Sequence, residues 1–292
     1  MIQKAILATD TSKAAEVLLH CTDQYKAMGV RHITLFHALG IQYMNFSGYT
    51  FLDHTKARLE EIKSQLVASG FEVDIVIKEG LPYSELVELG RERPDDLLIL
   101  ASRGMGFAKG VLLGSTADQV IRRSKNPVLL IQCNEDSEDG KDAGGKFSCP
   151  LSFDRLLFAT DFSDWSEEAF QFFKKNLLQS TEEIIIAHIV DSAALEHRSE
   201  ADVEKLKNNF MERLKRLKND IPTQNGLEIS IELRTGKPIK ELAEIIRDNK
   251  IKLVLMGTHG KGFIKDHILG STTRGVIEES KVNHLIIPFN HG

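Results

Sequence analysis

The chain contains one sequence pattern twice. KAILATDTS at 4–12 returns as RLLFATDFS at 155–163, and ITLFHAL at 33–39 returns as IIIAHIV at 184–190, both at an offset of 151 residues. Later segments repeat at an offset of 156: LLILASRG at 97–104 matches LVLMGTHG at 253–260, and LLGST at 112–116 matches ILGST at 268–272. A repeat that extends over so much of the chain indicates two copies of one fold.

The repeats also set the domain boundaries. Between them, NEDSEDGKDAGGK at 134–146 is acidic and nearly free of apolar residues, which is typical of a solvated linker. The 292 residues are enough for two separate cores. We therefore predict a first domain at 1–133, a linker at 134–152 and a second domain at 153–292.

Within each copy, short apolar runs alternate with amphipathic stretches, a pattern that predicts βαβ units and a parallel sheet. Strands are expected at about 2–9, 32–38, 72–78, 96–101 and 127–132, and again at about 154–160, 183–190, 227–233, 252–257 and 283–288. Helices between them include 13–28, 52–69, 83–93 and 115–124. The predicted fold class is α/β: two tandem doubly wound, Rossmann-like (HUP-type) domains, each a five-stranded parallel sheet between helices.

Composition and charge argue against several partners. A net charge of -5 leaves no basic surplus for nucleic acid, and no apolar run is long enough to cross a membrane. The N-terminus enters a short apolar strand without the sections of a signal peptide, so a cytoplasmic location is expected. Cys21, Cys133 and Cys149 have neither the spacing of a zinc site nor that of a disulfide framework. We expect three reduced thiols and no metal site.

The most informative motif is Gly257-Thr258-His259-Gly260 at the end of a predicted strand, followed after nine intervening residues by Gly270-Ser271. In an open α/β sheet, ligands bind beyond the carboxyl ends of the strands, where strand order reverses, so Asp161 and this loop should meet in one crevice. Glycine lets backbone approach a ligand, and the helix that follows offers free N–H groups to a phosphate. Asp161 could accept from a ribose hydroxyl or an adenine amino group, or it could simply cap the next helix. Neither a Walker A loop nor a G-x-G-x-x-G fingerprint is present.

Gly-x-x-Gly, nine residues and then Gly-[Ser/Thr] is the signature of ATP-binding universal stress proteins. The chain resembles the tandem two-domain form of that family over nearly its whole length. The resemblance implies an adenine-nucleotide ligand, ATP or AMP, with Mg as an optional counter-ion of the ligand, and it assigns no catalytic residue. The site that it implies in the second domain comprises Ala159, Thr160, Asp161, Ile189, Met256, Gly257, His259, Gly260, Gly270, Ser271 and Thr272.

The counterpart in the first domain is expected to be weaker. Ala101 replaces the first glycine, and Asp118 resembles part of a capping box at a place where Arg274 brings positive charge to the second domain. Against this, Arg103 could clamp a phosphate where the second domain has His259. This first-domain site comprises Ala8, Thr9, Asp10, Ala38, Leu100, Ala101, Arg103, Gly104, Gly114, Ser115 and Thr116.

Two further side-chain groups allow a structural interpretation. His37 and His188, which match a family histidine, are expected to be hydrogen-bonded core residues without a catalytic role. An aromatic stretch, formed by Tyr43, Phe46, Tyr49 and Phe51, is expected to pack on its own domain, with a crevice cover or an interface as the alternative.

Three functional hypotheses follow. The first is a regulatory adenine-nucleotide-binding protein of stress response or signalling. The second is slow ATP hydrolysis or phosphoryl transfer at Gly257–Thr272, against which stands the lack of paired carboxylates for magnesium. The third is a nucleotide-independent interaction scaffold. The two domains are expected to associate within the chain as a pseudo-dimer through strands 127–132 and 283–288, and a homodimer of chains remains open.

Overall fold

The computed structural model describes residues 2–40, 48–103, 113–132, 149–222, 226–260 and 269–289, with side chains at all of these except 13, 14 and 48–51. Gly104, the acidic stretch 134–146 and the aromatic side chains predicted to pack over the first domain lie outside this description. The chain forms two compact units that divide between Leu151 and Ser152. Each unit is described by itself.

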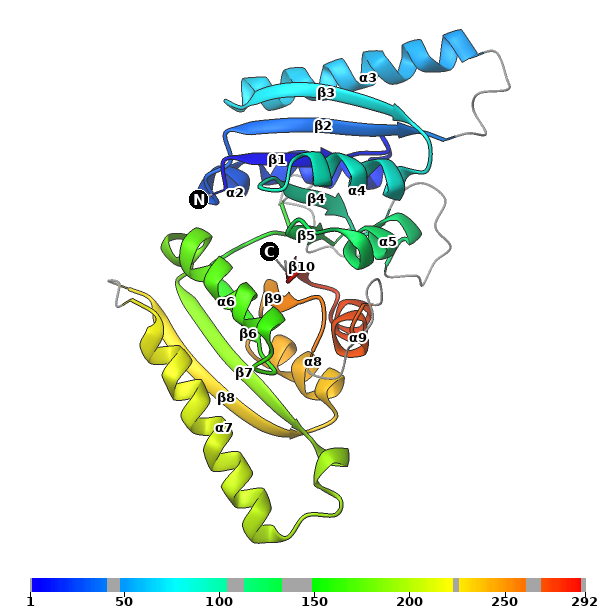
Figure 1. The fold of residues 1–292 in the computed structure, drawn as a ribbon. Helices are drawn as coiled ribbons and strands as arrows, with labels where there is room; N and C mark the ends of the chain where they lie inside the picture. The colour runs from blue at the N-terminus through cyan, green and yellow to red at the C-terminus, as the bar shows by residue number, and fades with distance from the viewer. Residues whose placement is uncertain are drawn as a thin grey trace. The chain divides into compact units, whose positions relative to one another are not determined.

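The first unit contains a five-stranded parallel sheet (Figure 1). Its strands lie in the order β3-β2-β1-β4-β5, and every neighbouring pair is parallel. The strands are β1 (Lys4–Ala8), β2 (His32–Leu39), β3 (Glu72–Glu79), β4 (Leu97–Ala101) and β5 (Val128–Ile131). The helices are α1 (Lys13–Glu16), the 3-10 segment η1 (Val17–Cys21), α2 (Thr22–Ala27), α3 (Gly48–Ala68), α4 (Pro82–Glu92) and α5 (Ser115–Arg123).

The second unit repeats the topology, with strand order β8-β7-β6-β9-β10 and parallel pairs throughout. Its strands are β6 (Arg155–Ala159), β7 (Glu183–Asp191), β8 (Glu228–Gly236), β9 (Leu253–Gly257) and β10 (Asn283–Ile287). Its helices are α6 (Asp164–Asn176), η4 (Leu178–Ser180), η5 (Ser192–Leu195), α7 (Glu200–Asp220), α8 (Pro238–Asp248) and α9 (Ser271–Ser280).

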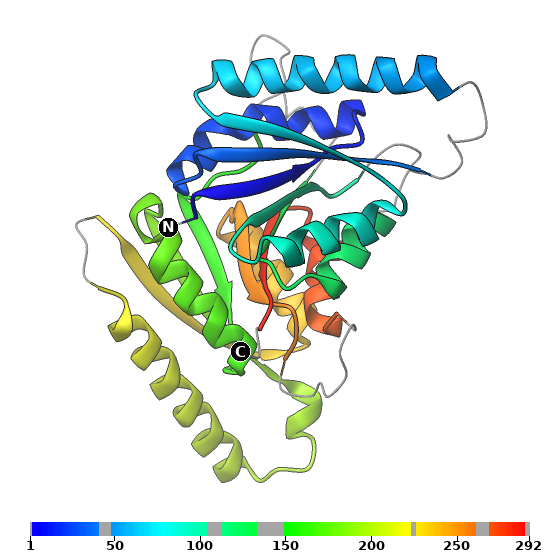
Figure 2. The ribbon, with the colours of Figure 1, turned by 45° about the horizontal axis from the view of Figure 1, so that its top comes forward.

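Helices cover both faces of each sheet. In the first unit, α4 and α5 lie side by side against one face, and η1, α2 and α3 lie on the other (Figures 1 and 2). The strands are therefore buried on both sides, which explains why β4 and β9 are continuous apolar runs rather than alternating ones. In both units the connections leave the first and fourth strands in opposite directions. The loops after these two adjacent strands thus emerge together at the carboxyl edge of the sheet.

All ten predicted strands are confirmed, and the fold class with them. One predicted helix is wrong: residues 13–28 form three short segments, α1, η1 and α2, whereas the corresponding α6 is continuous. The chain tightens into a 3-10 turn that ends at Cys21, where φ is −98° and ψ is 20°, outside helical geometry.

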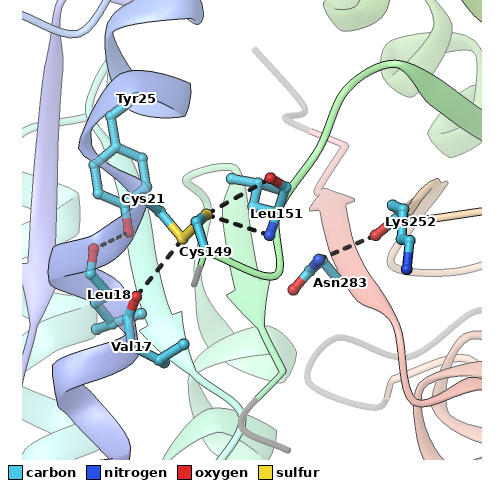
Figure 3. Close-up of a disulfide and its surroundings, with 8 residues drawn as sticks. All are labelled: Val17, Leu18, Cys21, Tyr25, Cys149, Leu151, Lys252 and Asn283. Atoms are coloured by element: carbon cyan, nitrogen blue, oxygen red, sulfur yellow. Dashed lines mark hydrogen bonds between the residues drawn. A yellow bond between two sulfur atoms is a disulfide. The ribbon is translucent and has the colours of Figure 1, made fainter. Parts of the chain in front are cut away.

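The expectation of three reduced thiols is also wrong. Cys21 forms a disulfide with Cys149, whose Cα lies 4.9 Å from that of Cys21 and 128 residues away in the sequence (Figure 3). This Cα separation is within the range that a disulfide spans. The sequence spacing gave no sign of the pair, because the fold brings distant residues together.

Candidate functional site

The loop after β6 has a tightly bonded turn. The Oδ1 atom of Asp161 accepts hydrogen bonds from the backbone N of Ser163 at 3.0 Å and from its Oγ at 2.5 Å. The Oγ1 atom of Thr160 accepts from the N of Phe162 at 2.9 Å, and Phe162 has φ at +60°. A bulky residue rarely adopts this left-handed conformation, so the side-chain hydrogen bonds hold the turn in shape.

The same turn follows β1 in the first unit. The Oδ1 atom of Asp10 accepts from the N of Ser12 at 3.0 Å, and the Oγ1 atom of Thr9 accepts from the N of Thr11 at 3.0 Å. Thr11 has φ at +61°. The two copies of the sequence motif thus form two copies of one backbone geometry.

Neither aspartate caps the following helix. The N-cap of α6 is Ser163, whose side chain accepts from the N of Ser166, and the N-cap of α1 is Ser12, which accepts from the N of Ala15. The interpretation of Asp161 as a helix cap is therefore wrong. Its carboxylate orders the turn before the helix and lies at the carboxyl edge of the sheet.

A buried histidine supports each turn from the neighbouring strand. The Nδ1 atom of His188 lies 2.7 Å from the carbonyl oxygen of Thr160, and that of His37 lies 2.9 Å from the carbonyl oxygen of Thr9. A carbonyl oxygen only accepts, so Nδ1 carries the proton in both rings. The expectation of hydrogen-bonded core histidines is confirmed, and each histidine fixes the residue that precedes the aspartate.

The loop after β9 meets this turn in the second unit. A Cβ atom added to Gly260 would lie 2.5 Å from the Oδ2 atom of Asp161. No side chain fits at residue 260 without displacing the carboxylate. The topology predicted this meeting of the two loops.

Gly257 has a packing role that the sequence did not suggest, and its predicted contact with a ligand stays a prediction. A Cβ atom there would lie 2.7 Å from the Cβ of Trp165 and 2.9 Å from its carbonyl carbon. The missing side chain therefore allows α6 to pack closely on β9. A Cβ atom at residue 257 would point toward Trp165. At the matching positions the first copy has Ala101 and Ala14, a larger residue on the strand and a smaller one on the helix.

The glycine at the start of the next helix is held in the same way in both units. Gly270, the N-cap of α9, donates its N–H to the carbonyl oxygen of Thr258 at 2.9 Å, and Gly114 donates to that of Ser102 at 2.8 Å. Ser271 is exposed and Thr272 is half-buried, so both can reach a ligand at this helix N-terminus. We call Thr160–Ser163, Thr258–Gly260 and Gly270–Thr272 the carboxyl-edge site of the second unit.

The helix that follows the glycine contains an ion pair in both units, but the order of acid and base along the helix is reversed. In α5 the Oδ2 atom of Asp118 accepts from the Nε of Arg122 at 2.7 Å, and in α9 the Nε of Arg274 donates to Glu278 at 2.8 Å. The expected capping box is wrong, because the N-cap of α5 has no side-chain hydrogen bond and Asp118 pairs one turn onward instead. Of these two ion pairs, only the one in α9 has its cation nearer the N-terminus of the helix.

The remaining predicted residues fall into three groups. Ala159, Ile189, Met256 and Leu100 are strand residues with at most 9% of their surface exposed, so a contact with an adenine ring stays a prediction. Ala8, Ala38, Ala101 and Arg103 are half-buried, as is His259, whose ring lies against that of Trp165 at 5.5 Å between centroids. Ser115 is exposed and Thr116 is half-buried, as their second-unit counterparts are.

The sequence did not reveal an aromatic cluster beside the turn. Phe162 stacks on Phe210 of α7 at 5.8 Å between centroids, and His188 lies 4.3 Å from Phe210. The guanidinium of Arg213 lies 4.1 Å from the centre of the Phe162 ring. The signal that could have found it was the helical spacing of Phe210 and Leu214, which places one apolar face of α7 toward the sheet.

Two doubly wound α/β units in tandem, each with an aspartate turn after its first strand and a glycine-capped helix after its fourth, define the class of this protein. The sequence matches the model of the universal stress protein family over residues 1–132 and again over residues 152–288. The chain belongs to the universal stress protein family.

Individual relatives agree with this assignment. Universal stress protein Slr1230 of Synechocystis sp. is 25% identical over 283 residues, which cover 91% of this chain and 86% of that protein. Universal stress protein MJ0577 of Methanocaldococcus jannaschii is 28% identical over 155 residues, covering 45% of this chain and 96% of the relative. The crystal structure of a universal stress protein from Archaeoglobus fulgidus has the same fold, with a TM-score of 0.70 at 22% identity and 99% coverage of both chains.

Within the part of the chain that the structure describes, no helix is both long enough and apolar enough to span a bilayer.

Proposed function

We propose that the chain is a regulatory protein of stress response or signalling that binds ATP or AMP at the carboxyl-edge site of the second unit. The observation that carries the proposal is the contact between residues 161 and 260. It places a carboxylate, which can accept from a ribose hydroxyl or an adenine amino group, beside backbone without a side chain. The backbone N–H groups at the start of α9 come next in the chain, and they can donate to phosphate oxygens.

The preference for the second unit rests on charge order. In α9 the cation of the Arg274–Glu278 pair lies in the first turn, whereas in α5 that place holds the carboxylate of Asp118. An anionic ligand at the helix N-terminus is closer to a positive charge in the second unit and to a negative charge in the first. Ala101 no longer supports the preference, because the glycine at the matching position accommodates Trp165.

Regulation rather than catalysis is the proposed role, with Mg only as a counter-ion of the ligand. The alternative is slow hydrolysis of ATP or phosphoryl transfer at Gly257–Thr272. Phosphate release by the wild type and by Ser271→Ala tests it. Release of many phosphates per chain that is lost in the variant would support an enzyme. No phosphate release together with retained ATP binding would support a regulatory role.

A nucleotide-independent scaffold is the other alternative. Mass spectrometry of small molecules released from freshly purified, denatured protein separates it from our proposal. An adenine nucleotide at close to one equivalent per chain is the expected result, and its loss in Gly260→Ala would assign it to the second unit. Protein that carries no nucleotide and takes up none at millimolar concentration would favour the scaffold.

The proposal extends to location and assembly. We propose a cytoplasmic protein whose two units associate as an intramolecular pseudo-dimer through β5 and β10, without nucleic acid or membrane as a partner. The support is the equal topology of the two units, in which both strands lie at the end of the strand order within their own unit. A homodimer of chains is a further possibility that sedimentation at several concentrations would detect.

A further inference from the structure

We propose that Cys21 and Cys149 form a redox-responsive site that exchanges with low-molecular-weight thiols and disulfides and thereby sets the length of the tether between the two units. The disulfide joins the end of η1 to a residue just beyond the acidic stretch 134–146 (Figure 3). Both cysteines belong to the first unit. A disulfide in a protein proposed to be cytoplasmic suggests a redox sensor more than a permanent staple.

The two cysteine residues differ in exposure. Cys21 is fully buried, whereas Cys149 is half-buried. The N–H of Leu151 lies 3.3 Å from the Sγ atom of Cys149, and Leu151 itself is buried. A small thiolate can therefore reach the sulfur of Cys149 more readily than that of Cys21.

This difference defines the direction of exchange. A thiolate forms a bond with the Sγ atom of Cys149, the bond between the two protein sulfurs breaks, and Cys21 leaves as a thiolate that takes up a proton. The carbonyl oxygen of Val17, 3.6 Å from the Sγ atom of Cys21, can accept from the resulting thiol. A second small thiolate attacks the mixed disulfide and releases Cys149. Two small thiols become one disulfide, and the two electrons pass to the two cysteines.

The consequence follows from the covalent chain. With both thiols reduced, residues 132–154 connect the end of β5 to the start of β6, a path of roughly 80 Å when fully extended. With the disulfide formed, Cys149 is fixed to the first unit and only residues 150–154 remain, roughly 20 Å. The effective concentration of one unit near the other falls approximately as the −3/2 power of tether length, so oxidation raises it roughly tenfold.

A cleavage experiment tests the pairing. In the full chain, a recognition sequence for a specific protease replaces residues 137–143, and Cys133 is changed to serine so that it cannot pair. After oxidation with glutathione disulfide and cleavage, the Cys133→Ser protein should run at full length on a denaturing gel without reductant and as two fragments with it. The same protein with Cys149→Ser or Cys21→Ser should give two fragments in both lanes. Separation of the Cys133→Ser fragments without reductant would overturn the proposal.

A second measurement tests reversibility. The intact Cys133→Ser protein is equilibrated under native conditions with mixtures of reduced and oxidised glutathione, quenched in acid and alkylated, and its free thiols are counted by mass spectrometry. We expect the count to change from two to none across the series, and the mixed disulfide to form on Cys149. Uncatalysed disulfide exchange takes roughly minutes to hours. A disulfide that persists for a day in about 10 mM reduced glutathione would therefore be a permanent structural crosslink and would contradict the proposal.

Discussion

Gly260 lies so close to Asp161 that a Cβ atom at residue 260 would stand 2.5 Å from the Oδ2 atom of the carboxylate. The two residues come from loops almost one hundred positions apart, after β6 and β9, which are neighbours in the sheet. A side chain at residue 260 would therefore have to displace the carboxylate of Asp161. Variants at this contact report on the site without disturbing the strands.

The packing of Gly257 on Trp165 leads to the first prediction. Gly257→Ala should lower the free energy of unfolding by about 1–3 kcal/mol, because its methyl group overlaps the Cβ and the backbone of Trp165. In a Trp165→Gly background the same substitution should cost less, because the Cβ atom nearest to the added methyl group is gone and only the backbone contact remains. Denaturant unfolding followed by circular dichroism measures the cycle.

Ala101→Gly is the matched control for that cycle. It should change stability by about 1 kcal/mol or less, the usual cost of glycine against alanine. Equal losses from Gly257→Ala in the wild type and in the Trp165→Gly background would show that the Cβ atom of Trp165 does not require the glycine.

The hydrogen bond from His188 to the carbonyl of Thr160 leads to the second prediction. His188→Leu should leave that carbonyl unpaired and weaken ATP binding about fivefold, equivalent to about 1 kcal/mol, because the turn that carries Asp161 loses its support. His188→Asn can place an amide donor near the same position and should retain more of the affinity. Calorimetric titration measures both, and a thermal melt of each variant shows whether the fold is intact. Equal affinities for the wild type and the leucine variant would contradict the positioning role.

Burial of His284 leads to a prediction about pH. Burial lowers the pKa of His284 from 6.5 to about 3, because the charged ring loses its hydration. Between these two values the unfolded chain binds a proton that the folded chain does not. The stabilisation is therefore complete above pH 6.5 and is lost as the pH falls, by about 2 kcal/mol at pH 5.

His284→Val is the control, because Val128 occupies the matching place in β5. The decrease in the free energy of unfolding from pH 7 to pH 5 should be smaller in this variant by about 2 kcal/mol. Identical decreases in the two proteins would exclude the residue as the source of the pH dependence.

Most of the fold could be predicted from the sequence because each strand is a separate apolar run. The strands predicted in one copy also agree with those predicted at the matching positions of the other copy. The meeting of Asp161 with Gly260 followed from strand order alone, since adjacent parallel strands end at the same edge. The hydrogen bonds of the two core histidines could also be predicted, because a polar ring at the end of a buried strand needs a partner.

The parts that sequence reasoning missed depend on side-chain direction. The pattern shows a glycine at residue 257, and it does not show that a Cβ there would meet Trp165 rather than a ligand. The same limit applies to Asp118, whose sequence neighbours resemble a capping box although its carboxylate pairs with Arg122. The disulfide was missed because Cys21 and Cys149 are adjacent only in the folded chain.

Calorimetric titration of the full chain with ATP and with AMP tests the central claim most directly. The protein is compared as wild type, as Gly260→Ala and as Gly226→Ala. The last is a control outside the site: its added Cβ meets nothing within 4 Å, and its φ of +93° adds a backbone strain that alanine at residue 260 does not carry. We predict binding to the wild type and to Gly226→Ala, and at least tenfold weaker binding to Gly260→Ala with its fold retained. Unchanged affinity in Gly260→Ala, or no binding by the wild type at millimolar nucleotide, would contradict the assignment of the site.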